Sequence, residues 1–183
     1  MFKSLPNKLT LSRIIVIPII LLLLFVPHGW AAWLALILFS LAGATDWLDG
    51  YLARRDNEVT KIGQFLDPIA DKLLVSAVIL VLVSNQQITG LTIFPAIIIL
   101  MREVAVSGLR EFLAGLQVSV PVSRLAKWKT TIQMIALGFL MIGDKYAPSL
   151  IPATAIGDLG LWIAGGFTVV TAWDYWRASL KHF

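Results

Sequence analysis

The sequence predicts an all-α integral membrane protein with about six transmembrane helices. Of its 183 residues, 58% are hydrophobic and 14% are charged, whereas soluble domains have about 45–50% apolar and about 25% charged residues. The hydrophobic residues also occur in long runs, and a run of about 20 is long enough to cross a bilayer as a helix. Because no internal repeat or long linker divides the chain, we expect residues 1–183 to form a single domain.

The first three predicted spans end at residues that break helices or mark a membrane interface. Residues 9–26 precede Pro27 and lack a following small-residue cleavage site, so we expect a retained span and not a signal peptide. Residues 30–53 begin with tryptophans, which favour the interface, and are followed by two arginines. Residues 63–84 stop before the polar turn at 85–90.

The last three spans have similar boundaries. Residues 91–116 form a hydrophobic run that is unusual in carrying four charged residues, and Pro121 breaks the chain after it. The fifth run covers residues 123–142 and is followed by a predicted loop from Gly143 to Pro152. Residues 155–176 form the sixth run.

Lysine and arginine mark one side of the membrane. They gather at both termini and at alternate loops, whereas the intervening turns hold only Lys145. The basic residues of the first set are Lys3, Lys8, Arg54, Arg55, Lys61, Arg124, Lys127, Lys129, Arg177 and Lys181. Because cytoplasmic loops are rich in Lys and Arg, we expect a multi-pass protein of the inner membrane with both termini cytoplasmic.

The composition also excludes several kinds of site and partner. With no cysteine, the chain has no disulfide, thiolate zinc site or cysteine nucleophile. Its two histidines, His28 and His182, lie near the ends of elements, so we expect neither a histidine metal site nor a Ser-His-Asp triad. The net charge of +4 comes from residues that flank apolar runs. This pattern favours membrane lipids or phosphate substrates as partners and not nucleic acid.

Four aspartates, Asp46, Asp49, Asp67 and Asp71, stand inside or beside the second and third spans. Their i,i+3 and i,i+4 spacings place each pair on one helix face, and a turn between the spans would bring the pairs together at the cytoplasmic ends. Clustered carboxylates near hydrocarbon need neutralisation. Oxygen ligands of this kind favour Mg²⁺, Mn²⁺ or Ca²⁺. We therefore predict an active site with two divalent cations.

The same stretch resembles the signature of the CDP-alcohol phosphotransferases. It reads Asp46-x-x-Asp49-Gly50-x-x-Ala53-Arg54, eight residues, then Gly63-x-x-x-Asp67-x-x-x-Asp71. No position departs from the pattern. The family is built on six transmembrane helices with the motif on the second and third, so the resemblance extends over the whole chain.

Within the family, the chain is similar to the bacterial branch that uses glycerol 3-phosphate, through stretches such as PNKLTLSR and REVAVSGLRE. The resemblance implies transfer of a phosphatidyl group from CDP-diacylglycerol to glycerol 3-phosphate, release of CMP, and a homodimer. It also implies that the four aspartates hold two Mg²⁺ or Mn²⁺ ions and that Asp71 is the base. Gly50, Ala53, Arg54 and Gly63 would shape the CDP-lipid site.

Asn7 and Thr10 stand near the start of the first span. The resemblance places them on the nucleotide side of the site, as part of the CDP-lipid-binding set. The alternative is a helix cap followed by a snorkelling Arg13.

Glycerol 3-phosphate is a dianion, so its pocket needs arginine or lysine. The predicted acceptor-phosphate residues are Arg102, Arg110, Arg124 and Lys127. The alternative is that the basic residues at the start of the fifth span, Lys129 among them, are anchors at the membrane edge. Arg102 has a second alternative, an ion pair with a carboxylate such as that of Glu103.

Two other functions remain open from the sequence. An enzyme of the same family with inositol phosphate, serine or phosphatidylglycerol as acceptor, the last as in cardiolipin synthesis, would carry the same motif. A divalent-cation transporter would also place carboxylates inside spans. A transporter predicts polar residues along the full depth of the bilayer, whereas here they gather at the cytoplasmic ends.

Overall fold

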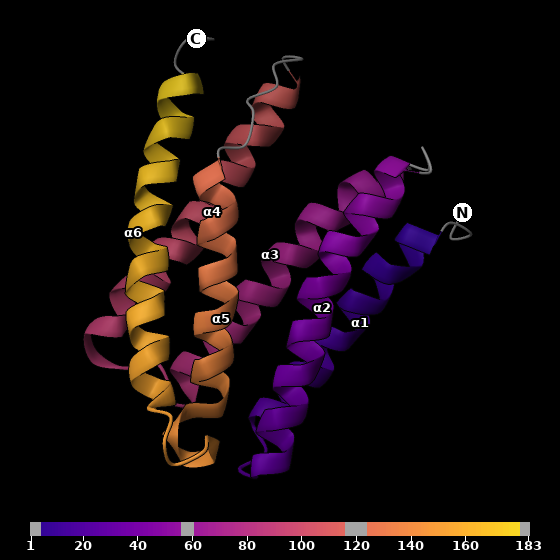
Figure 1. Ribbon diagram of the computed structural model, residues 1–183. Coiled ribbons are helices and arrows are strands. Elements are labelled where there is room, and N and C mark those ends of the chain that lie inside the picture. Colours follow the sequence, from indigo (N-terminus) through magenta and orange to yellow (C-terminus); the bar gives the residue numbers. More distant parts are fainter. Residues whose placement is uncertain (1–4, 56–60, 116–123, 180–183) are drawn as a thin grey trace.

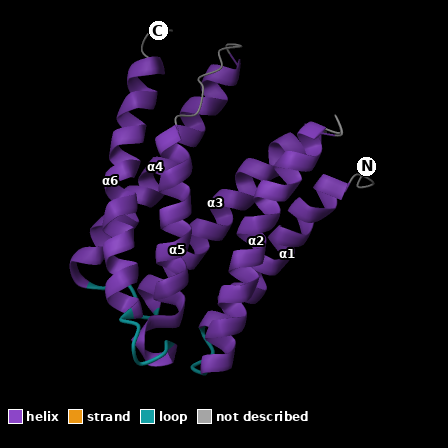
Figure 2. Ribbon diagram, in the orientation of Figure 1, coloured by secondary structure: helices purple, strands orange, loops and turns teal. Residues whose placement is uncertain are grey.

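The computed structural model describes residues 5–55, 61–115 and 124–179, and these are helical apart from short turns (Figure 2). Side chains at 5–9, 46–55, 61–65, 67, 68, 71, 114, 124, 126, 127 and 178 lie outside that description. The helices are α1 (Leu5–Leu24), α2 (Gly29–Arg55), α3 (Lys61–Ser84), α4 (Ile93–Gly115), α5 (Arg124–Tyr146) and α6 (Ala153–Ser179), with a 3-10 turn η1 (Gly90–Thr92) before α4. The predicted all-α class is confirmed, with one helix for each predicted span.

One clear difference from the predicted boundaries lies at the end of α5. Helical structure continues to Tyr146, four residues into the predicted loop, but Gly143 interrupts it with φ 57° and ψ 178°. A positive φ in this region is accessible to glycine without the penalty that a Cβ imposes. Gly143 is therefore a true break, and a short helical turn follows it.

Several features of the helices are those of a membrane protein. Within the described residues, Gly90–Leu113 and Ala153–Arg177 are long and apolar enough to cross a bilayer. Shorter apolar helical stretches occur in α1, α2 and α3. Leu22, Met101 and Val104 are 68–73% exposed, and so much exposed apolar surface suits contact with lipid.

The helices alternate in direction (Figure 1). We call the end of the molecule that holds the start of α1 the upper end, and the opposite end the lower end. The end of α2, the start of α3, the end of α4, the start of α5 and the end of α6 also lie at the upper end. The helix ends next to the Lys- and Arg-rich segments of the sequence therefore lie at one end of the molecule.

The packing joins two groups of helices. The first group has α1 against α2 and α3, the second has α6 against α5 and α4, and α2 packs on α5. Glycines let α6 approach closely: a Cβ at Gly157 would lie 2.5 Å from Leu140 Cγ, and one at Gly165 would lie 2.9 Å from Pro95 Cβ. By contrast, the described parts of α4 and α5 are not closely packed on each other, and α3 touches each of them only lightly.

Candidate active site

The aspartate motif lies on the last turns of α2 and the first turns of α3. Asp46 and Asp49 belong to α2, and Asp67 and Asp71 belong to α3, with the helical spacing that the sequence predicted. Both segments lie toward the upper end (Figure 1). The four side chains are outside the described ones, so the meeting of their carboxylates stays a prediction. Among the described side chains, no three His, Cys, Asp or Glu gather as a metal site would require.

The residues predicted to shape the CDP-lipid site lie in the same two helices and in α1. Gly50, Ala53 and Arg54 are on α2, and Gly63 is on α3, but their surroundings are outside the description. Asn7 is in α1, and its side chain is likewise not described.

Thr10 and Arg13 face the protein interior. Thr10 is 1% exposed and Arg13 is 2% exposed. The alternative of a snorkelling Arg13 is therefore wrong, because a snorkelling side chain keeps its guanidinium in water. A charged group buried this deeply needs polar partners, so the start of α1 contributes polar chemistry to the interior.

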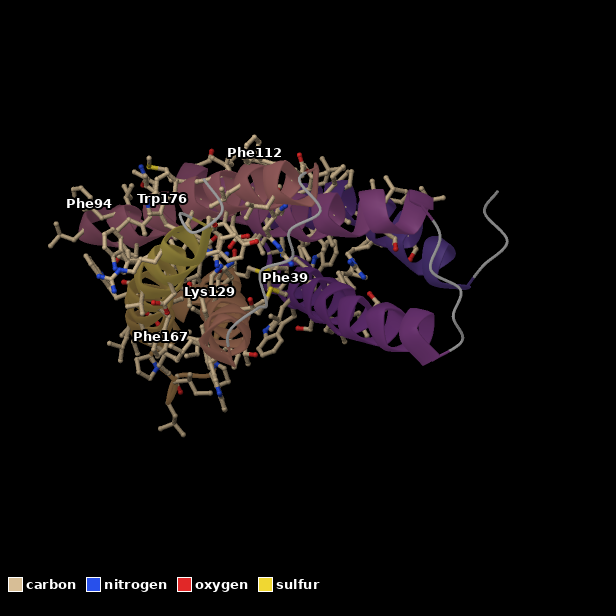
Figure 3. The ribbon with its side chains drawn as sticks, turned by 90° about the horizontal axis from the view of Figure 1, so that it is seen from above. Phe39, Phe94, Phe112, Lys129, Phe167 and Trp176 are labelled. Atoms are coloured by element: carbon tan, nitrogen blue, oxygen red, sulfur yellow. The ribbon has the colours of Figure 1, made fainter. Side chains whose placement is uncertain are left out.

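Lys129 of α5 is the most informative described cation. It is 3% exposed, and its ammonium forms an ion pair with Oε1 of Glu103 on α4. Figure 3 shows Lys129 between α5 and α4. The alternative of a membrane-edge anchor is therefore wrong for Lys129. Sequence analysis missed its role because the chain does not reveal which side of α5 faces inward.

Arg102 shares the same carboxylate. Its Nη1 lies 3.3 Å from Oε1 of Glu103, and the two side chains are 16% and 15% exposed. The alternative of an Arg102–Glu103 pair is thus confirmed. Arg102 and Lys129 thus place two cationic groups at the single carboxylate of Glu103.

A second lysine reaches α4 from α3. The ammonium of Lys72 donates a hydrogen bond to the hydroxyl of Ser107. Ser107 follows Glu103 by four residues, so both stand on one face of α4. We call Lys72, Arg102, Glu103, Ser107 and Lys129 the interior polar network. Neither lysine was among the predicted site residues.

Two buried polar atoms beside this network lack a hydrogen-bond partner among the described residues. They are Oε1 of Gln133, whose side chain follows Lys129 by one helical turn, and Nε of Arg102. Gln133 is 2% exposed. Buried polar groups in native proteins nearly always find a partner, so these atoms are available to a ligand or to water.

The predicted acceptor-phosphate residues have different surroundings. Arg110 is exposed on α4, and Arg102 is paired with Glu103. Arg124 and Lys127 are in the first turn of α5, and their side chains are outside the description. Nothing in the described geometry brings these four residues together.

The lower end has polar side chains of another kind. They line a cavity of about 460 Å³ between the α1–α2, α3–α4 and α5–α6 connections. Gln87 Nε2 donates to the carbonyls of Leu140 (2.9 Å) and Met141 (3.2 Å). Asn85 Nδ2 donates to the carbonyl of Leu24 at 2.8 Å. These side chains cap helix ends and are remote from the aspartate motif.

Comparison with known proteins finds similarity over the whole chain. Residues 3–170 match the family model described as CDP-alcohol phosphatidyltransferase. A Rickettsia felis protein is 48% identical over 181 residues, which cover 99% of this chain and 98% of the relative. A Bacillus subtilis protein is 43% identical over 188 residues, covering 96% and 95%. A Cereibacter sphaeroides protein is 37% identical over 213 residues, covering 98% and 96%. Each is named CDP-diacylglycerol–glycerol-3-phosphate 3-phosphatidyltransferase.

Proposed function

Because the chain belongs to the CDP-alcohol phosphatidyltransferase family, we propose that it transfers the phosphatidyl group of CDP-diacylglycerol to glycerol 3-phosphate. The products are phosphatidylglycerol phosphate and CMP. The observation that carries the proposal is the full-length similarity, at 37–48% identity, to relatives named for this reaction. Membership of a transferase family favours this function over cation transport.

The donor set of the motif suits divalent metal ions. Asp46, Asp49, Asp67 and Asp71 offer only carboxylate oxygens, at helical spacings that put each pair on one face. Such hard ligands match Mg²⁺ or Mn²⁺. These four residues would hold two ions, which when bound neutralise the pyrophosphate and stabilise the CMP leaving group.

The protein's own residues then position and deprotonate the acceptor. Asp71 takes the proton of the attacking hydroxyl of glycerol 3-phosphate. The hydroxyl oxygen forms a bond to the phosphorus that carries diacylglycerol. The bond from this phosphorus to the CMP oxygen breaks, and CMP leaves with the electron pair. Gly50, Ala53 and Gly63 leave room for the cytidine diphosphate close to the backbone, since none has a large side chain.

Basic residues bind the phosphates of both substrates, the CDP-lipid and glycerol 3-phosphate. Arg54 lies beside the phosphates of the CDP-lipid, and Asn7 and Thr10 contact its nucleotide side. The acceptor phosphate is held by basic residues of α4 and α5, since arginine and lysine suit a dianion. The residues in this role are Arg102, Arg110, Arg124 and Lys127. Arg102 has further donors beyond the Nη1 that contacts Glu103.

A substrate panel tests the function. The purified protein in detergent or liposomes is given CDP-diacylglycerol with glycerol 3-phosphate, inositol phosphate, serine or phosphatidylglycerol. We expect CMP release and a phosphatidylglycerol phosphate product with glycerol 3-phosphate alone. Turnover with another acceptor and none with glycerol 3-phosphate would assign a different member of the family. Metal flux into liposomes without lipid turnover would favour the transporter.

We also propose six spans in the inner membrane, with the termini and aspartate motif on the cytoplasmic side, and a homodimer. The distribution of Lys and Arg supports this orientation. Because the chain has no cysteine, Leu150→Cys introduces a single thiol at a position that is 94% exposed in the α5–α6 connection. We expect a membrane-impermeant thiol reagent to label it in intact cells; labelling only after lysis would reverse the orientation. Chemical crosslinking in the membrane tests the dimer.

A further inference from the structure

The interior polar network joins three helices that are otherwise loosely connected. Within the described residues, α4 and α5 do not pack closely, and α3 makes only light contact with both. Lys129 reaches across from α5 to Glu103, and Lys72 reaches across from α3 to Ser107. Among the described residues, long polar side chains thus bridge helices that pack only lightly on one another.

The network also lies beside the residues that the proposed function needs. Lys72 directly follows Asp71, the proposed base, and Lys129 is two residues after Lys127 in the first turns of α5. Glu103 and Ser107 stand one turn apart on α4. One face of α4 is thus contacted by Lys72 of α3, the helix that carries Asp71, and by Lys129 of α5.

We propose that Glu103 is a positioning residue for the acceptor substrate. By holding Lys129, it fixes the start of α5 and its basic residues relative to α4 and to the aspartate-bearing α3. This inference rests on the proposed function, because the acceptor is glycerol 3-phosphate or a similarly small anionic alcohol.

The energetics of buried ion pairs favour a positioning role over simple stabilisation. Replacing a buried pair with apolar residues of similar volume is often neutral or stabilising, whereas removing one partner strands a buried charge. Lys129, at 3% exposure, loses one carboxylate partner if Glu103 loses its charge, and such a loss is costly at a buried site. What the pair adds beyond an apolar contact is a defined geometry, since Oε1 of Glu103 also engages Arg102 at 3.3 Å.

A double-mutant cycle with steady-state kinetics tests the role. For Glu103→Gln and for Lys129→Met we expect KM for glycerol 3-phosphate to rise about tenfold, with KM for CDP-diacylglycerol within about twofold, as is typical for loss of an orienting partner. If Glu103 acts through Lys129, the combined variant is no worse than either single one. Glu103→Asp should recover part of the loss, and Glu111→Gln, at an exposed site on α4, should change neither KM.

A second variant separates positioning from folding. Glu103→Leu combined with Lys129→Met replaces the Lys129–Glu103 pair with an apolar contact. Arg102, which is 16% exposed, loses its 3.3 Å contact with Glu103 in the same variant, and the fold should be preserved. We expect this protein to melt near the wild-type temperature and still to have the raised KM for glycerol 3-phosphate. A wild-type KM in this variant would overturn the proposal, as would equal additive losses for both substrates in the cycle.

A distance measurement tests, without any enzymatic turnover, whether Glu103 fixes α5 relative to α4. Because the chain lacks cysteine, spin labels can be attached through Met101→Cys on α4 and Ile135→Cys on α5, at positions 68% and 54% exposed. We expect pulsed electron resonance to give one narrow α4–α5 distance distribution and Glu103→Gln to broaden it. A reference pair on the closely packed α5 and α6, Ile135→Cys with Trp162→Cys, should not change.

Failure of the proposed function can be distinguished from failure of the positioning role of Glu103. A wild-type protein that is inactive with glycerol 3-phosphate refutes the proposed function, and the distance measurement still decides whether Glu103 positions α5. An unchanged α4–α5 distribution in Glu103→Gln refutes the positioning role, even if the enzyme is active as proposed.

Discussion

The interior polar network and the lower-end caps both consist of polar side chains in a hydrophobic protein, but they engage different partners. At the lower end, Gln87 and Asn85 donate to backbone carbonyls at helix ends. Asp144 and Thr154 exchange hydrogen bonds there, from Thr154 N to Asp144 Oδ1 at 2.9 Å and from Asp144 N to Thr154 Oγ1 at 3.2 Å. In the interior polar network, the contacts are between side chains, and Lys72 and Lys129 each reach a side chain on another helix, α4.

The difference separates side chains that stabilise helix ends from side chains that we expect to take part in the reaction. The first and last turns of a helix have backbone groups without intrahelical partners, and side chains that cap them satisfy a need of every helical protein. A side chain in a helix interior has no such backbone group to satisfy, so charge placed there needs another reason. In membrane proteins that reason is most often function. We therefore expect substitutions in the two regions to affect different measured quantities.

Chelation has the largest expected effect and acts only on the aspartate region. We expect EDTA to reduce transfer to the background rate and added Mg²⁺ or Mn²⁺ to restore it, because four clustered carboxylates lose the ions that neutralise them. Far-ultraviolet circular dichroism should change little, since the lower-end caps need no metal. Full activity in excess EDTA would refute the proposed metal site.

Asp71→Asn should lower kcat by about 10³-fold or more, because an amide cannot accept the proton of the attacking hydroxyl. The matched control is Asp158→Asn, an aspartate that lines the lower cavity. This control should retain near-wild-type kcat. Equal losses in the two variants would break the distinction between the regions, and near-normal kcat in Asp71→Asn would refute its role as base.

Ser107→Ala should have an intermediate effect. It removes the hydroxyl that accepts a hydrogen bond from Lys72, so α3 loses one of its contacts with α4 next to Asp71. We expect kcat to fall about tenfold, as for loss of an orienting partner. Ser84→Ala, at the exposed end of the same α3, serves as a control that should leave kcat unchanged.

The smallest expected effect follows from Asp144→Ala. The variant loses the carboxylate that accepts a hydrogen bond from the backbone N–H of Thr154 at the start of α6. Loss of such a cap costs about 1 kcal/mol of unfolding free energy. Thermal unfolding in detergent should shift down while both KM values stay constant. A change in KM for glycerol 3-phosphate would show that the two regions are coupled.

The sequence predicted the helices well and the interior partners poorly, for one physical reason. Long apolar runs mark spans directly, and the periodic aspartates mark one helix face. In a bilayer, however, the lipid-facing side of a helix is as apolar as its packed side, so periodicity does not reveal which face is buried. The sequence therefore left a membrane-edge anchor open for Lys129, although the residue is buried. Its contact with Glu103 joins positions 26 residues apart, which local pattern cannot specify.

The hydrogen bonds from Gln87 to the last turns of α5 have a consequence for the order in which the helices assemble. Its amide comes from the α3–α4 connection, and its partners, the carbonyls of Leu140 and Met141, are 53 and 54 residues further along the chain. Since a chain is synthesised from its N-terminus, α1 to α4 are made before these carbonyls exist. The hydrogen bonds of Gln87 at the lower end therefore form late in biogenesis, after α5 has packed against the first four helices.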